Sequence, residues 1–346
     1  MCYYFGETGV YSQNNLKMKP NSLDFDKLKQ VIEYLAPANP MYSLFGGEPL
    51  IYPHLEELIL EIKKAKSFVD TPTNGTLLEE NAEMLVKTKF DSVRVSLDGP
   101  RKQNDIQRGN NSYDKAIAGI EALVEEKKKQ HAKRPDLSII YTVTPENYDS
   151  IEELFLMDLS LEHFNWITIQ MQNFITQEMG KNYAKFLKTE FNIDDARYWK
   201  GLVREPQDFL NIDCLELSRQ VLRVKEALKK KNKYLLLLPP SFTPDNLDAY
   251  LKADWSKMSD QYNSCIIPWV STDIVANGDI APCHIFYDLV MGNLYEDSFQ
   301  DIWFGSKYQK FRDYISRNQF MSICPGCCIL YLSGNKVRKR ASKKNK

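Results

Sequence analysis

Five of the seven cysteines in this 346-residue chain lie in its last quarter, and their spacing suits metal chemistry. The segment Cys324-Pro325-Gly326-Cys327 places two sulfurs on one side of a tight turn. Two more distant cysteines, Cys265 and Cys283, complete a set of four thiolates, and Cys328 lies beside the turn. The pattern predicts a metal or cluster site, and burial as small apolar side chains is the alternative.

Three short polar motifs in the first third of the chain suit a small ligand. In Gly46-Gly47-Glu48-Pro49 the glycines expose backbone amides, Glu48 can accept a hydrogen bond from an ammonium group, and Pro49 fixes the exit. Thr73-Asn74-Gly75 follows, and then Ser96-Leu97-Asp98-Gly99, in which Ser96 and Asp98 can accept hydrogen bonds from ribose hydroxyls. One such motif is also compatible with an ordinary turn, but three in order indicate a binding site.

Alternating strand and helix patterns must position these motifs. We predict strands at 41–45, 67–72, 91–97, 137–144 and 166–172, with helices between them. Such alternation is typical of an α/β fold with a parallel sheet, in which ligands bind at the carboxyl ends of the strands. Each motif follows one of the predicted strands. Gln170 and Gln172 end the last of them, and one of the two is a further candidate for the site.

We divide the chain into four parts. Residues 1–175 form the barrel-like half, and residues 176–255 form a helical, charged insert or bridge without an assigned role. Residues 256–332 form a small cysteine-rich α+β domain, and residues 333–346 form a basic tail that we expect to be disordered.

The first-half motifs resemble those of the radical S-adenosylmethionine (SAM) superfamily, and the segment 104–109 adds to the resemblance. The resemblance implies a partial (βα)6 barrel, a SAM-binding [4Fe-4S] cluster, and reductive cleavage of SAM to a 5′-deoxyadenosyl radical that abstracts hydrogen from a substrate. It also implies a cofactor site made of Gly46, Gly47, Glu48, Pro49, Thr73, Asn74, Ser96 and Asp98, with Arg108 near the bound SAM.

The chain departs from the family at its beginning. The family binds its first cluster with C-x3-C-x2-C after the first strand, and here only Cys2 corresponds, as the third ligand. We expect the first strand of the barrel and the first two cysteines to be missing, so that five of the six strands are present. We expect that the start is misplaced or that the sequence is a fragment. A degenerate member without the cluster, or an unrelated Cys2, are the alternatives. A chain with one of three thiolates should be a poor catalyst or none.

The C-terminal pattern resembles the SPASM or shorter twitch domains of radical SAM enzymes. Cys265, Gly278-x4-Cys283, Gly292-Asn293-Leu294 and Cys324-x2-Cys327 occur in the family's order. The resemblance implies one auxiliary [4Fe-4S] cluster on Cys265, Cys283, Cys324 and Cys327, for which Cys328 could substitute as a ligand. Relatives of this kind modify peptides, proteins or small metabolites, and need a reductant such as flavodoxin or ferredoxin.

Composition excludes several other classes of function. Lys and Arg number 45 and Asp and Glu 46, so the formal charge of −1 gives no reason to expect nucleic acid as a partner. No apolar run approaches the ~20 residues of a membrane helix, and we expect a cytoplasmic protein. Two rival hypotheses remain: a non-catalytic pseudoenzyme that keeps one auxiliary cluster, and a structural zinc-tetrathiolate protein.

Overall fold

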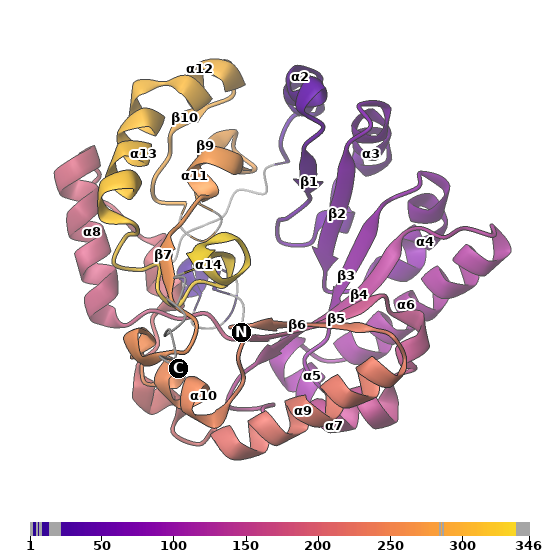
Figure 1. Ribbon diagram of the computed structural model, residues 1–346. Helices are drawn as coiled ribbons and strands as arrows, with labels where there is room; N and C mark the ends of the chain where they lie inside the picture. The colour runs from indigo at the N-terminus through magenta and orange to yellow at the C-terminus, as the bar shows by residue number, and fades with distance from the viewer. Residues whose placement is uncertain are drawn as a thin grey trace, which may run out of the picture.

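A single parallel sheet organises the first two thirds of the computed structural model, which describes residues 3–4, 6, 9–13, 22–283, 285 and 287–336. Its six strands follow one another in chain order, and Figure 1 shows them as a curved sheet. They are β1 (Met41–Ser43), β2 (Phe68–Thr73), β3 (Ser92–Ser96), β4 (Asp136–Val143), β5 (Trp166–Met171) and β6 (Tyr234–Leu238). The α/β class and the parallel sheet are therefore confirmed.

Helices cover the convex face of the sheet because that face is apolar. Val93 and Val95 alternate along β3 and are fully buried, as is Leu97 just after the strand, whereas Arg94 and Ser96 lie on the opposite face. Figure 1 shows α3, α4 and α6 along the outside. The helices of this half are α1 (Val10–Gln13), α2 (Phe25–Leu35), α3 (Leu55–Lys64), α4 (Leu78–Lys87), α5 (Arg101–Arg108), α6 (Ser112–Lys129) and α7 (Ile151–Glu153), with short turns η1 (Ala36–Ala38), η2 (Pro49–Ile51), η3 (Leu154–Asp158) and η4 (Leu161–His163).

The sheet does not end where we expected the barrel to end, at residue 175. β6 pairs in parallel with β5 from Trp166↔Tyr234 to Gln170↔Leu238, so the expectation of five strands was too low. The sixth strand was missed because a short continuous apolar run does not distinguish a buried strand from a helix. It is reached through α8 (Gln177–Phe191), η5 (Tyr198–Leu202), η6 (Pro206–Phe209) and α9 (Cys214–Lys230), and α10 (Pro244–Leu251) and η7 (Trp255–Lys257) follow it.

The predicted insert 176–255 divides between two cores. Val221, Val224 and Leu228 of α9 belong to the barrel core, whereas Tyr183 and Leu187 of α8 join the core of the C-terminal part. The insert thus packs on both halves, and both the insert and bridge readings remain predictions.

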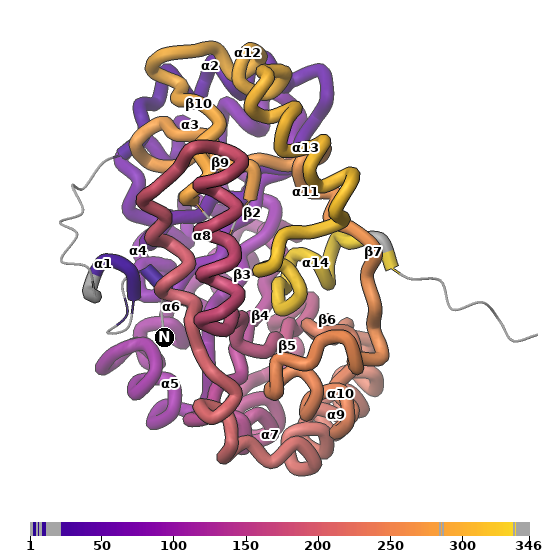
Figure 2. Tube along the Cα trace, turned by 90° about the vertical axis from the view of Figure 1, so that its left-hand side faces the viewer, coloured from indigo at the N-terminus to yellow at the C-terminus, as the bar shows by residue number. Residues whose placement is uncertain are grey.

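The C-terminal part lies across the open side of the sheet (Figures 1 and 2). It contains the antiparallel sheet β10-β9-β8 and the antiparallel pair β11-β7. Its elements are β7 (Tyr262–Ser264), α11 (Ile267–Val270), β8 (Asp273–Ile274), β9 (Asp279–Ala281), β10 (Gly292–Asn293), α12 (Phe299–Phe304), α13 (Ser306–Asn318), α14 (Cys328–Ser333) and β11 (Asn335–Lys336). In the described part of the chain, no helix is both long enough and apolar enough to cross a membrane. Most of the predicted basic tail lies outside the described residues.

Candidate functional site

The loop 44–48 connects β1 to η2 and contains Gly46, Gly47 and Glu48, and Glu48 ties it to the end of β2. One carboxylate oxygen, Oε1, accepts hydrogen bonds from Thr73 Oγ1 at 2.7 Å and from the Leu50 backbone N–H at 3.2 Å. The other, Oε2, accepts from the Asn74 backbone N–H at 2.9 Å. The structure therefore brings the predicted site residues Glu48, Thr73 and Asn74 together, and the Glu48 carboxylate accepts hydrogen bonds from protein donors.

The glycines of this loop leave its backbone open. Gly46 and Gly47 are exposed, and a Cβ added to Gly46 would meet no atom within 4 Å. Gly75, at the end of β2, is different, because its φ is +79° and an added Cβ would lie 3.0 Å from the Ala116 side chain. The first pair therefore leaves its backbone accessible, while Gly75 is required by the fold.

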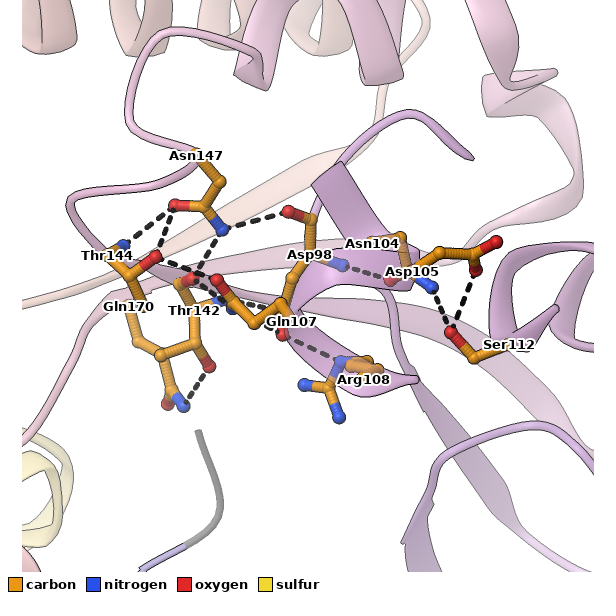
Figure 3. A network of polar contacts seen from close by, with 10 residues as sticks. All are labelled: Asp98, Asn104, Asp105, Gln107, Arg108, Ser112, Thr142, Thr144, Asn147 and Gln170. Atoms are coloured by element: carbon orange, nitrogen blue, oxygen red, sulfur yellow. Dashed lines mark hydrogen bonds and ion pairs between the residues drawn. The ribbon is translucent and has the colours of Figure 1, made fainter. Parts of the chain in front are cut away.

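Asp98 lies at the end of β3 and is fully buried. Its Oδ1 accepts the Thr142 backbone N–H at 2.7 Å, and its Oδ2 accepts Gln107 Nε2 at 2.8 Å. Arg108 Nε lies 2.6 Å from the same Oδ2, an ion-pair contact between the predicted site residues Asp98 and Arg108. Figure 3 shows this network. The Asp98 carboxylate has no surface left for a ligand, so the ribose contact expected for it is not available in this arrangement. Ser96 is half-buried on the inner face.

Two asparagines complete the surroundings of Asp98. Asn104 Oδ1 accepts the Asp98 backbone N–H at 2.9 Å, and Asn147 Nδ2 donates to the Asp98 carbonyl at 2.8 Å and to the Thr142 carbonyl at 2.9 Å. Both asparagines are buried. Our sequence reasoning missed the role of Gln107 and Asn147. Gln107 belongs to the segment 104–109, which is part of the family resemblance, whereas no sequence motif pointed to Asn147.

Arg108 and Gln170 lie at the border of this network. Gln170 Nε2 donates to Thr142 Oγ1 at 3.0 Å, and its partner in the β4–β5 register is also Thr142. The Arg108 side chain is 18% exposed, and its Nε makes the contact with Asp98. In Figure 3 the ends of both side chains extend to the same side of the strands. The network thus presents a guanidinium and a carboxamide together.

The four cysteines predicted as auxiliary ligands line one cavity. Cys265, Cys283, Cys324 and Cys327 share it with apolar side chains that include Phe311 and Ile315. Burial raises the pKa of the Cys265 and Cys324 thiols. Among the described residues, no three His, Cys, Asp or Glu side chains lie close enough to hold a single metal ion. The cysteines therefore surround a common apolar space without converging on one point.

Two other cysteines differ from this set. Cys328 is not among the lining residues of the cavity, and its Sγ accepts a hydrogen bond from Asn173 Nδ2 at 3.1 Å. Cys2 lies outside the described residues. Its neighbour Tyr3 donates from its hydroxyl to the Asn173 carbonyl at 2.7 Å. Asn173, just past β5, therefore contacts both the N-terminal segment and the cysteine-rich turn.

Comparison with known families agrees with this arrangement. Residues 2–157 match the model of the radical SAM superfamily, and residues 265–328 match that of SPASM, an iron-sulfur cluster-binding domain. This chain belongs to the radical SAM superfamily. Its two domains imply iron–sulfur clusters and SAM as cofactors.

The names of two curated relatives describe two different functions. A tungsten-containing aldehyde ferredoxin oxidoreductase cofactor-modifying protein of Pyrococcus furiosus is 24% identical over 306 residues, which cover 82% of this chain and 73% of that protein. An Fe-coproporphyrin III synthase of Methanosarcina barkeri is 31% identical over 188 residues, which cover 54% of this chain. This chain spans only 44% of that second relative.

Solved structures share the fold of this chain. Streptococcus suis SuiB bound to S-adenosylmethionine is 18% identical with a TM-score of 0.59, over 90% of this chain and 68% of that one. SuiB bound to the precursor peptide SuiA gives a TM-score of 0.58 at 17% identity, over 91% and 65%. The enzyme anSMEcpe with bound AdoMet gives 0.54 at 16% identity, over 94% and 84%. The radical SAM fold of the chain is thereby confirmed.

Proposed function

We propose that this protein binds SAM above the carboxyl ends of β1–β3 and uses it to modify a peptide or protein. The observation that carries this proposal is the convergence of two family motifs at neighbouring strand ends: the loop of Glu48 tied to Thr73 and Asn74, and Asp98 paired with Arg108. When bound, SAM and its cluster supply a 5′-deoxyadenosyl radical that abstracts hydrogen from the substrate.

The residues of the chain would then bind SAM and orient it. The exposed backbone of Gly46 and Gly47 offers peptide groups to the methionyl end of SAM, and Pro49 fixes the exit of this loop. Glu48 holds the loop to Thr73 and Asn74, and its carboxylate keeps an acceptor site for the ammonium group of SAM. Ser96 retains the proposed contact with the ribose. Arg108 offers its guanidinium, which Asp98 orients through Nε.

A second centre is proposed in the C-terminal cavity. Cys265, Cys283, Cys324 and Cys327 would hold one auxiliary [4Fe-4S] cluster, which is larger than a single ion and suits thiols that line a space without meeting at a point. The apolar lining would keep water from the cluster. This geometry favours a cluster over the zinc-tetrathiolate alternative, for which the thiols would have to converge on one ion.

The substrate class rests on analogy with relatives. SuiB binds a precursor peptide and anSMEcpe binds the Cp18Cys peptide, which supports a peptide or protein substrate. The names of the curated relatives support modification of a cofactor or porphyrin as a second candidate. We propose a flavodoxin or ferredoxin as reductant.

The test measures SAM binding and cleavage separately. Anaerobically reconstituted protein is dialysed against labelled SAM, and 5′-deoxyadenosine is then quantified by mass spectrometry after reduction. We expect saturable binding that Asp98→Asn weakens and Arg134→Gln, a change in an exposed ion pair, does not. Absence of saturable binding to a protein that carries all three motif cysteines would refute the proposal. Binding without 5′-deoxyadenosine from a protein with all three motif cysteines would favour the pseudoenzyme.

A further inference from the structure

The strand that carries the glycine loop is weakly held by its own backbone. β1 contains three residues, and within the part of the chain that the structure describes it lies at the edge of the sheet and pairs only with β2. Its first residue, Met41, is exposed. Beyond the strand, Leu44 donates its N–H to the Asp70 carbonyl at 2.8 Å and accepts from Thr71 Oγ1 at 2.8 Å. Short edge strands of this kind open readily unless side chains hold them.

Arg94 reaches β1 from the third strand of the sheet. Its Nη2 donates to Ser43 Oγ at 3.0 Å and lies 2.8 Å from Asp70 Oδ2. Its guanidinium carbon is also 5.8 Å from the centre of the Phe45 ring, the residue that precedes Gly46. One cation therefore contacts the last residue of β1, the middle of β2 and the start of the glycine loop.

The surroundings make this contact stronger than a surface ion pair. The side chain of Arg94 is 24% exposed and that of Asp70 is 9% exposed. Because water has little access to the pair, the charges are screened less than at the surface, and loss of one partner leaves the other poorly solvated. None of these residues was singled out from the sequence, because the contact joins positions in three different strands.

We propose that Arg94 is a positioning residue for the glycine loop. It fastens the loop at Ser43 and Phe45, while Glu48 fastens the other end to Thr73 and Asn74. Between these anchors lie Gly46 and Gly47. The importance of Arg94 for SAM binding rests on the function proposed above, but its effect on the loop does not.

The first measurement therefore needs no cofactor. Hydrogen–deuterium exchange is followed in the cofactor-free chain of 346 residues, for peptides that cover 41–45 and 137–143. For Arg94→Gln we expect exchange in 41–45 to become about tenfold faster, the loss typical of one charge-assisted hydrogen bond, with 137–143 unchanged. Arg134→Gln is the matched control, because it removes an exposed Arg–Asp pair elsewhere in the sheet, and it should leave 41–45 unchanged.

Two milder variants separate positioning from general stability. Arg94→Lys keeps the charge near Asp70 and should recover part of the protection of 41–45. Ser43→Ala removes one hydrogen bond and should accelerate exchange there by about two- to fivefold. Unchanged exchange in 41–45, or equal acceleration in 41–45 and 137–143, would overturn the proposal. If Arg94→Gln fails to fold, these two variants decide it by the same criterion.

The second measurement links the loop to its ligand. Equilibrium dialysis against labelled SAM with reconstituted protein should show about tenfold weaker binding for Arg94→Gln, and no change for Arg134→Gln. Faster exchange with unchanged SAM affinity would refute the positioning role. If the unaltered protein with all three motif cysteines does not bind SAM at all, the proposed function fails, and the exchange experiment still decides what Arg94 does to the loop.

Discussion

The pairing of Asp98 with Arg108 can be tested by a double-mutant cycle. Asp98→Asn keeps an oxygen that can accept the Thr142 N–H, but it turns an amide NH2 toward Gln107 Nε2, which now donates to Oδ2. Gln107 Nε2 would then face another donor, and Arg108 would lose the negative charge beside its Nε. Arg108→Gln removes the cation and leaves a fully buried carboxylate without its charged partner.

The size of the effect follows from the burial of the pair. Loss of one partner of a buried ion pair costs about 3–5 kcal/mol in the free energy of unfolding, and less where water can reach the remaining charge. Because the Arg108 side chain is 18% exposed, we expect about 2–3 kcal/mol for Asp98→Asn. With an unfolding entropy of about 2.1 cal/mol/K per residue, this lowers Tm by roughly 3–4 °C in a chain of 346 residues.

The assay is urea unfolding of the apo protein, followed by circular dichroism, for the wild type, both single variants and the double variant. We expect a coupling free energy of about 2 kcal/mol, and below about 1 kcal/mol for the exposed pair Arg134–Asp136 treated in the same way. If the Asp98 and Arg108 single effects add to within about 0.5 kcal/mol, the two side chains do not act together, and the proposed orientation of Arg108 is wrong.

Three further predictions concern the other parts of the site. Thr73→Val removes the hydroxyl donor to Glu48 and should weaken SAM binding about five- to tenfold in equilibrium dialysis; an unchanged Kd would contradict the tether. Cys324→Ala should lower iron and labile sulfide by about one four-iron cluster, whereas Cys214→Ala should lower neither. Equal iron in both variants would refute the ligand assignment. Tyr250→Phe removes a buried hydroxyl and should lower the free energy of unfolding in urea by about 1–2 kcal/mol. An unchanged unfolding midpoint would show that the hydroxyl does not stabilise the fold.

The strands of the barrel differ in how far the sequence predicts them. β1 to β5 were predictable because each combines a strand pattern with a polar or helical segment at its end. β6 was not, because Leu235, Leu236, Leu237 and Leu238 show no alternation and follow a lysine-rich helix end. What makes them a strand is a parallel pairing with β5, a partner more than 60 residues earlier in the chain.

The contacts between side chains of the candidate site were likewise only partly predictable from the sequence. Asp98 was predictable as a site residue from its motif, but its environment was not. The register pairs Ser96 with Ile140, and thereby brings Thr142 beside Asp98. Local patterns do not fix that register, because it depends on how two strands align across the intervening helices. The sequence therefore identified residues of the network, while the alignment of the strands sets the environment in which Asp98 lies within ion-pair distance of Arg108.

The end of β5 joins the two proposed centres physically. Tyr250 donates its hydroxyl to the Gln172 carbonyl at 3.0 Å and to the Gly326 carbonyl at 3.4 Å, and Asn173 contacts Tyr3 and Cys328. A Cβ added to Gly326 would lie 2.9 Å from the Phe174 carbonyl, so the cysteine turn touches the same segment. Because Asn173 contacts Cys328 and Phe174 lies against Gly326, a rotation of the C-terminal part would break contacts to both residues. The segment next to Cys2 and the turn of the auxiliary cysteines therefore contact the same short stretch at the end of β5.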